Sequence, residues 1–230
     1  NDYDVNLDDF RGKLLPIESK YLTSNLHALQ RLLQGPPGTG KSHKLTQKLR
    51  RDLHINKEAE QHQVKRVTCH LEMTSADFIG AYQPVTDDDG ALSYRFVPGA
   101  LVSLLHRALR CPEKPHVLII EELNRANAAA MFAEAFQLLD RVEVGDELAE
   151  TELGWSAYPT SLGVHVQRYL VEADPYHEES EVLDEATTTQ LRGAVRLPPN
   201  LAIWATLNTA DQSVFPLDTA FKRRWSFEYL

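Results

Sequence analysis

The fold is decided by one stretch of the chain, Gly35-Pro36-Pro37-Gly38-Thr39-Gly40-Lys41-Ser42, which fits the pattern G-x-x-x-x-G-K-[ST]. A short apolar run precedes it and regularly spaced leucines follow it, so it joins a predicted strand to a predicted helix. Glycines let the backbone fold around phosphate oxygens with its N–H groups pointing inward, and the helix adds its positive end. The stretch therefore predicts a phosphate-binding loop rather than a chance Gly-Pro-rich turn.

Two side chains of this loop are expected to act on a bound nucleotide. Lys41 would reach the terminal phosphates, and the hydroxyl of Ser42 would ligate Mg²⁺. The phosphates would otherwise be held by the rest of the loop, Gly35, Pro36, Pro37, Gly38, Thr39 and Gly40. A nucleoside triphosphate with Mg²⁺ is thus the predicted ligand.

Outward from the loop, short apolar runs alternate with helical periodicity from Leu32 to about Arg141, which is typical of strand and helix units on a parallel sheet. Leu32 to Gln34 reads as a short first strand, preceded by a helical pattern from Leu26 to Arg31. Val64 to His70 reads as the second strand. One face of a later helix is marked by Leu101, Leu104, Leu105, Ala108 and Leu109. We expect an α/β fold with a doubly wound, mainly parallel sheet.

Two carboxylates follow the continuous apolar run from Val117 to Ile120, which suits a strand covered on both faces. In a doubly wound sheet the ligand lies at the carboxyl ends of the strands, so Glu121 and Glu122 would share a crevice with the loop. We assign Glu121 to the Mg²⁺ shell and Glu122 to polarising the attacking water. The alternative is that both acids merely cap the next helix.

A third apolar strand, Leu201 to Thr206, leads to Asn208, whose amide can orient water beside a γ-phosphate; the alternative is a turn asparagine. The N-x-x-D spacing from Asn208 to Asp211 also matches a guanine-specificity motif, which we discount because its usual basic residue is missing. Farther on, Arg223 and Arg224 suit the stabilisation of charge on a transferring phosphoryl group. A solvated basic patch is the alternative reading of the two arginines.

The composition of the chain indicates which kinds of partner it can bind directly. Acidic residues outnumber basic ones by 33 to 24, and the net charge of -9 gives no broad basic footprint for nucleic acid. The sequence has no charged-then-apolar leader and no run of about 18 apolar residues, and its 2 cysteines are too few for a disulfide framework. We expect a cytoplasmic protein without a membrane partner.

One domain is expected from residue 25 to residue 230, after an N-terminal extension over residues 1–24. Between about residues 142 and 195 the regular rhythm breaks, and the stretch is rich in Glu and Asp. We interpret this stretch as an acidic insertion within the domain.

With these elements in order, the chain from about Leu33 to Leu230 resembles AAA+ proteins of the McrB type, the NTPase subunits of modified-cytosine restriction systems. MoxR-like and dynein-related AAA modules share the broader pattern. The resemblance rests on LLQGPPGTGKS at 32–42, DFIGAYQP at 77–84, VLIIEELNRAN at 117–127, LPPNLAIWATLNTADQS at 197–213 and LDTAFKRRWSF at 217–227. The sequence departs from the family at Glu121, where Asp is usual.

The resemblance implies roles for several residues. Asn208 looks like the sensor 1 residue, and Arg223 or Arg224 looks like an arginine finger that acts on the nucleotide of a neighbouring subunit. Asn124 and Arg125 look like subunit-interface residues. The resemblance thus implies a ring oligomer, expected to be a hexamer.

The resemblance also implies further structural elements. A hairpin is inserted in the second helix, and Tyr82 to Phe96 is the candidate because Asp89-Gly90 is a hairpin turn signal. Another hairpin would precede the sensor strand, inside the acidic insertion. A small helical lid normally follows the point where this sequence ends, at Leu230.

Two functions stay open from the sequence. The first is a Mg²⁺-dependent ATPase or GTPase that drives a nuclease or effector subunit in defence against foreign DNA, with DNA bound through other domains or the partner. The second is a MoxR-like chaperone module with slow turnover, in which the nucleotide state gates a partner interaction. Glu122 and Asn208 favour turnover. The general AAA+ pattern favours ATP and the McrB resemblance favours GTP.

Overall fold

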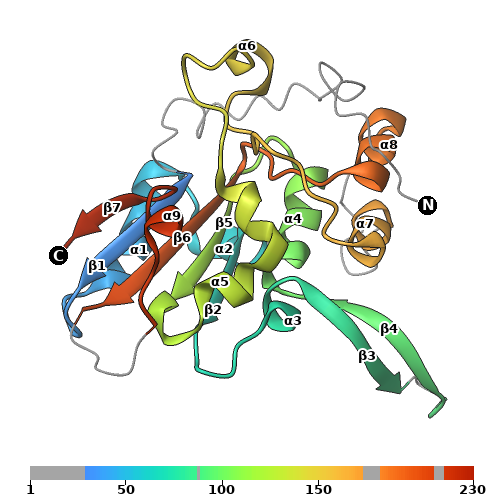
Figure 1. Cartoon of the computed structure of the whole chain (residues 1–230), viewed down its shortest axis with the longest axis horizontal. Helices are drawn as coiled ribbons and strands as arrows, with labels where there is room; N and C mark the ends of the chain where they lie inside the picture. Colours follow the sequence, from blue (N-terminus) through green and yellow to red (C-terminus); the bar gives the residue numbers. More distant parts are fainter. Residues whose placement is uncertain (1–28, 87–88, 173–181, 210–214) are drawn as a thin grey trace.

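The computed structural model describes residues 29–86, 89–172, 182–209 and 215–230, so the expected N-terminal extension lies outside it. Its centre is a five-stranded sheet in which all neighbouring strands are parallel (Figure 1). The spatial order is β2 (Val64–Thr68), β5 (His116–Glu121), β6 (Leu201–Asn208), β1 (Gln30–Gly35) and β7 (Ser226–Tyr229). The expected α/β fold with a mainly parallel sheet is confirmed.

Helices cover both faces of this sheet. Alternate residues of each strand point to opposite sides, so both faces present apolar side chains that a helix can bury. One face is covered by α1 (Lys41–Asp52) and α2 (Lys57–Gln63), and the other by α3 (Ser75–Phe78), α4 (Ala100–Arg110), α5 (Ala128–Phe132) and η4 (Ala133–Leu139). Along β5, Val117 and Ile119 pack on the α1 side, whereas Leu118 and Ile120 pack on the α4 side. This double burial explains why β5 is apolar without interruption from Val117 to Ile120.

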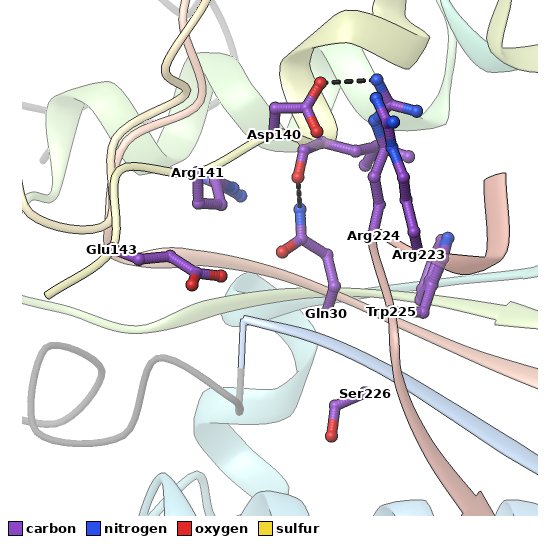
Figure 2. Close-up of a pocket in the computed structure, with 9 residues that line it drawn as sticks. Gln30, Asp140, Arg141, Glu143, Arg223, Arg224, Trp225 and Ser226 are labelled. Atoms are coloured by element: carbon purple, nitrogen blue, oxygen red, sulfur yellow. Dashed lines mark hydrogen bonds and ion pairs between the residues drawn. The ribbon is translucent and has the colours of Figure 1, made fainter. Parts of the chain in front are cut away.

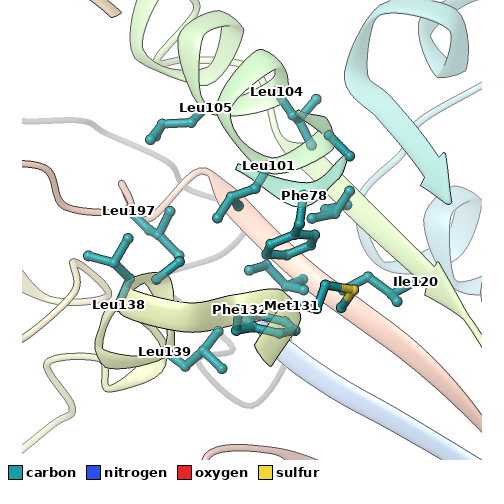
Figure 3. Close-up of a cluster of buried hydrophobic side chains, with 14 of the residues drawn as sticks. Phe78, Leu101, Leu104, Leu105, Ile120, Met131, Phe132, Leu138, Leu139 and Leu197 are labelled. Atoms are coloured by element: carbon teal, nitrogen blue, oxygen red, sulfur yellow. The ribbon is translucent and has the colours of Figure 1, made fainter. Parts of the chain in front are cut away.

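The larger of the two apolar clusters lies between the sheet and α3, α4 and α5 (Figure 3). Phe78 of α3 and Phe132 of α5 meet there with their ring centroids 4.4 Å apart. Leu101 and Leu105 of α4 are buried in the same cluster, as their helical spacing predicts. Each fully buried side chain of this size contributes about 2 kcal/mol. The packing fixes α4 and α5 against β5, the strand that ends in Glu121.

The first strand is longer than the sequence indicates. β1 begins at Gln30, so the helical pattern predicted up to Arg31 is wrong at Gln30 and Arg31, and residues 26–28 lie outside the described chain. Both side chains have partners from distant elements: the Gln30 amide donates to Leu139 O at 2.7 Å, and the Arg31 guanidinium pairs with Asp52 at 3.0 Å. These long-range contacts, together with parallel pairing to β6, override the local helical pattern.

The expected hairpin is confirmed. β3 (Gly80–Thr86) and β4 (Leu92–Pro98) pair antiparallel between α3 and α4, with Tyr82 opposite Phe96, and the hairpin extends away from the sheet (Figure 1). Gly90 lies in the connecting turn with a φ of 77°, a conformation that favours glycine. The base of the hairpin packs on the insertion through Tyr82 and His165, whose ring centroids are 4.5 Å apart.

The acidic stretch from residue 142 to 195 is more regular than its sequence indicates. It contains α6 (Ala149–Glu152), α7 (Val164–Val171) and α8 (Glu185–Gly193). A buried ion pair of 2.7 Å between Arg196 and Glu152 fastens it, as does an isolated bridge between Thr160 and Val195. Residues 142–172 and 182–195 include no paired strands beyond isolated bridges, so the hairpin expected in this stretch is not among them.

Candidate nucleotide-binding site

The loop between β1 and α1 has the backbone that its glycines predict. Gly38 and Gly40 have φ values of 80° and 79°, the left-handed region in which a side chain is strained. A Cβ at either position would meet nothing within 4 Å, so the backbone conformation rather than space requires glycine there. α1 then begins at Lys41 with no acidic residue in its first turn, which leaves its positive end suited to an anion.

Lys41 is turned onto the loop itself. Its ammonium donates to Gly35 O at 2.9 Å and to Pro36 O at 2.7 Å, and the Thr39 hydroxyl also donates to Pro36 O at 2.9 Å. Neutral carbonyls are weaker partners for an ammonium group than a phosphate, because a hydrogen bond between two charged groups is stronger. Residues 36–40 are exposed, so a phosphate can reach the loop from solvent.

The carboxyl ends of three strands meet at this loop. Gly35, the last residue of β1, pairs with Asn208, the last residue of β6. The Glu122 backbone N–H, just past β5, donates to the Thr206 hydroxyl of β6 at 2.9 Å. The sheet therefore brings the loop, the two carboxylates and Asn208 to one edge, as parallel pairing predicts.

Glu122 is held on both of its carboxylate oxygens. Oε1 accepts a hydrogen bond of 3.2 Å from the Asn208 amide, and Oε2 pairs with Arg125 Nε at 2.6 Å. The residue has a φ of 56°, a left-handed backbone that costs roughly 1 kcal/mol outside glycine. Asn124 braces Asn208, because its amide donates to Asn208 O at 2.9 Å. Sequence reasoning missed Thr206 and the Arg125 pair; only the E-x-x-R spacing could have indicated the latter.

Glu121 lies on the α1 side of the sheet, as the alternation along β5 requires. Its Oε1 is 3.4 Å from Arg66 Nη1, and Nη2 of the same arginine donates to the Thr46 hydroxyl of α1 at 2.9 Å. Thr46 is one helical turn after Ser42, whose side chain is exposed at the start of α1. The hydroxyl of Ser42 and the carboxylate of Glu121 are oxygen donors of the kind that Mg²⁺ takes, so the residues present fit that ion.

Cys69 follows β2 beside the two carboxylates. Its backbone N–H donates to Glu121 O at 2.8 Å. Burial, with a further contribution from the charge of Glu122, raises the pKa of the Cys69 thiol to about 12. The thiol is therefore neutral at physiological pH and unsuited to act as a nucleophile.

Arg223 and Arg224 lie near the amino ends of the strands, which we call the amino edge, whereas the phosphate loop lies at their carboxyl ends, the carboxyl edge. They follow α9 (Thr219–Lys222) and precede β7, whose first residue, Ser226, pairs with Arg31 near the start of β1. The length of β1 separates this edge from Gly35 by about 17 Å at the usual rise of a strand. A pocket of about 340 Å³ lies here, and its lining includes Gln30, Asp140, Arg141, Glu143, Arg223 and Arg224 (Figure 2).

The two arginines differ in their surroundings. Arg224 donates to Asp140 Oδ2 at 2.5 Å and to Ala220 O at 2.8 Å, and its guanidinium lies 4.1 Å from the ring centre of Phe136. Its side chain is only 8% exposed. Arg223 also lines this pocket and is exposed to solvent. The structure thus holds Arg224 within the subunit and presents Arg223 to solvent.

The parallel sheet and the phosphate-binding loop at its carboxyl edge define a P-loop NTPase fold. The match to known families is more specific: residues 30–225 match the AAA domain of the dynein-related subfamily, so the chain belongs to that family. No helix in the described residues has the length and apolar character needed to cross a bilayer.

Two curated relatives are restriction enzyme components. The chain is 38% identical over 221 residues to the type II restriction enzyme BsuMI component YdiS of Bacillus subtilis (strain 168), covering 87% of this chain and 56% of YdiS. It is 28% identical over 197 residues to the type IV methyl-directed restriction enzyme EcoKMcrB subunit of Escherichia coli (strain K12), covering 85% of this chain and 34% of that subunit. The resemblance to the McrB type is confirmed.

The chain spans between about a third and just over half of these relatives. A solved structure from Cytophaga hutchinsonii aligns with 97% of this chain and 49% of its own, at 15% identity and a TM-score of 0.42, too distant to add to the assignment. Family membership places the chain among nucleotide hydrolases in general. The roles of individual site residues remain predictions.

Proposed function

We propose that this chain binds a nucleoside triphosphate with Mg²⁺ at the carboxyl edge of its sheet and hydrolyses the γ-phosphate. The observation that carries the proposal is the meeting of Gly35, Glu122 and Asn208 at that edge, with the Asn208 amide 3.2 Å from Glu122 Oε1. A helix cap would need the carboxylates alone. It would not need an asparagine from another strand beside them and a phosphate loop paired to that strand.

Each group has a distinct part in this reaction. Lys41 leaves the loop carbonyls and pairs with the terminal phosphates, while the loop N–H groups hold the remaining oxygens. Glu122 accepts a hydrogen bond from the attacking water, and Asn208 orients that water against the phosphate. Mg²⁺, held by Ser42 and Glu121, would offset the negative charge of the phosphates.

In this proposal a second subunit supplies the positive charge that stabilises the transferring phosphoryl group. Arg223 comes before β7, at the end of β1 that is farther from its own loop, and the length of β1, about 17 Å, keeps it from the phosphates bound there. It is exposed, whereas Arg224 is tied to Asp140. We therefore assign the arginine finger to Arg223 of a ring neighbour and give Arg224 a structural part. A ring, expected to be a hexamer, provides such neighbours.

For the whole protein we propose a motor that works with a nuclease or effector subunit in a restriction system. Both curated relatives named above are restriction enzyme components, which favours this context over a chaperone module. DNA would be bound through other domains or through the partner, in keeping with the net charge of -9 on this chain. ATP and GTP both fit, because the residues of the site address phosphates and Mg²⁺ rather than a base.

Hydrolysis of ATP and of GTP by the full-length protein, with and without Mg²⁺, tests the proposal. Lys41→Ala should abolish nucleotide binding and turnover, since it removes a charge-assisted contact to the phosphates. Lys57→Ala is the matched control, because Lys57 is an exposed lysine on α2 outside the site, and it should change neither. Unchanged nucleotide affinity in Lys41→Ala protein would show that the loop does not bind phosphate.

A further inference from the structure

We propose that Arg125 is a positioning residue for Glu122 of its own subunit, in addition to any place at a subunit interface that family resemblance implies. The inference rests on the proposed hydrolysis, because it concerns the carboxylate assigned to the attacking water. Its basis is the 2.6 Å ion pair between Arg125 Nε and Glu122 Oε2, formed within one chain.

A local turn builds this pair without help from another subunit. The chain after Glu122 forms the short helix η3 (Leu123–Arg125), and the Arg125 backbone N–H donates to Glu122 O at 2.8 Å. This spacing places the guanidinium on the same side as the carboxylate three residues earlier. The left-handed backbone at Glu122 turns its carboxylate back over η3 and toward β6, where the backbone N–H bonds Thr206.

Arg125 and Asn208 hold the two oxygens of Glu122 from different parts of the fold. Arg125 comes from η3 and Asn208 from the end of β6. During turnover the Asn208 amide is needed at the phosphate and the water, so its bond to Glu122 has a competitor. Arg125 bonds the other oxygen, Oε2, and its ion pair does not depend on where the Asn208 amide lies. It is then the partner that keeps the carboxylate oriented while Asn208 acts on the phosphate.

The side chain of Arg125 is 49% exposed, and that of Glu122 is 29% exposed. An ion pair this exposed adds little to stability, because solvent screens it. Its expected contribution is therefore geometric: it selects one carboxylate orientation out of several. A residue of this kind should affect the rate of turnover and leave nucleotide affinity alone.

The first test compares Arg125→Ala and Arg125→Lys with Arg192→Ala, an exposed arginine on α8 that serves as control. In the full-length protein, Arg125→Ala should lower kcat about tenfold to a hundredfold, the usual loss when an orienting partner is removed, with KM and nucleotide affinity unchanged. Arg125→Lys should recover part of the rate, since it restores a donor and a charge. An unchanged or increased kcat, or a loss of nucleotide affinity, would overturn the proposal.

The second test separates action within a subunit from action across the interface. Arg125→Ala protein is mixed with Lys41→Ala protein, which lacks its own nucleotide but keeps Arg125 and Arg223. If Arg125 acts within its subunit, the mixture stays as slow as the Arg125→Ala protein alone. If the neighbour's Arg125 restores the rate in a mixture that co-assembles in sedimentation, the residue acts across the interface and the proposal is wrong. Failure of the proposed function would instead appear as hydrolysis by Lys41→Ala protein alone.

Discussion

The two edges of the central sheet use polar side chains in opposite ways. At the carboxyl edge, Lys41 donates to loop carbonyls and Asn208 donates to Glu122, in contacts that a bound phosphate can replace. At the amino edge, Arg141 donates to four backbone carbonyls and is almost fully buried, and Arg224 is locked to Asp140. The carboxyl edge also has the left-handed residue Glu122, whose strain other contacts must offset.

Under the proposed function, the groups at the carboxyl edge serve a ligand, whereas those at the amino edge serve folding. Substitutions at the carboxyl edge should change activity and leave stability nearly intact. Substitutions at the amino edge should do the reverse. Arg223 is the exception, because it lies at the amino edge and is nonetheless exposed to solvent.

The largest expected effect on activity is at Arg223, the amino-edge residue that departs from this rule. Arg223→Ala should lower turnover per subunit by about 10³ or more, the usual value of an arginine finger, while nucleotide binding persists. Arg224→Ala is the matched control: it should lower the free energy of unfolding, because Asp140 loses its partner. Steady-state hydrolysis and denaturant unfolding of both variants measure the two effects. Equal turnover in Arg223→Ala and wild-type protein would make Arg223 an ordinary surface cation.

Glu122→Gln should remove turnover by about 10² or more and keep nucleotide binding, since the neutral isostere preserves packing and removes the charge that polarises water. Glu121→Gln should instead raise the Mg²⁺ concentration needed for hydrolysis. Mg²⁺ titrations of both variants at saturating nucleotide measure this. Normal turnover in Glu122→Gln, with none in Glu121→Gln at saturating Mg²⁺, would reverse the two assignments.

At the amino edge, Arg141→Met should lower the free energy of unfolding by about 3 kcal/mol or more, because it leaves buried carbonyls without a donor. Thr39→Ala, which removes one exposed hydrogen bond at the other edge, should cost about 0.5 kcal/mol or less. Urea unfolding of both proteins checks the contrast. Similar stability losses in the two variants would remove the distinction between the edges.

His116 begins β5 at the amino edge and makes stability depend on pH. Burial lowers its pKa from 6.5 to about 4, so the folded protein keeps it neutral while the unfolded chain takes up a proton below pH 6.5. Its contribution is therefore fully present above pH 6.5 and is lost as the pH falls toward 4. At pH 5 the loss should be about 2 kcal/mol. Denaturant unfolding at pH 7.5 and pH 5 should show that extra loss in wild type and not in His116→Leu.

The phosphate loop and the ends of β5 and β6 could be predicted because their signals are local. Gly38 and Gly40 indicate a backbone with positive φ, and the apolar runs before Glu121 and Asn208 indicate buried strands. Parallel pairing then brings their ends together without further information.

The amino edge could not be predicted in this way, because its polar residues find partners far along the chain. Arg224 meets Asp140, 84 residues earlier, and Gln30 meets Leu139, 109 residues later. The same reason explains why Gln30 and Arg31 form strand against a local helical pattern, and why the acidic stretch is ordered around Arg196 and Glu152. Nothing in residue type or spacing distinguishes Arg223 from Arg224; only the packing of the second does.

The central claim is that the carboxyl edge of one subunit and Arg223 of its neighbour complete one site. Mixing Arg223→Ala protein with Lys41→Ala protein tests it most directly, because each supplies what the other lacks at a shared interface. We predict that neither protein alone hydrolyses nucleotide at an appreciable rate, and that the mixture regains part of the wild-type activity. Two inactive proteins that co-assemble in sedimentation and stay inactive together would contradict the claim.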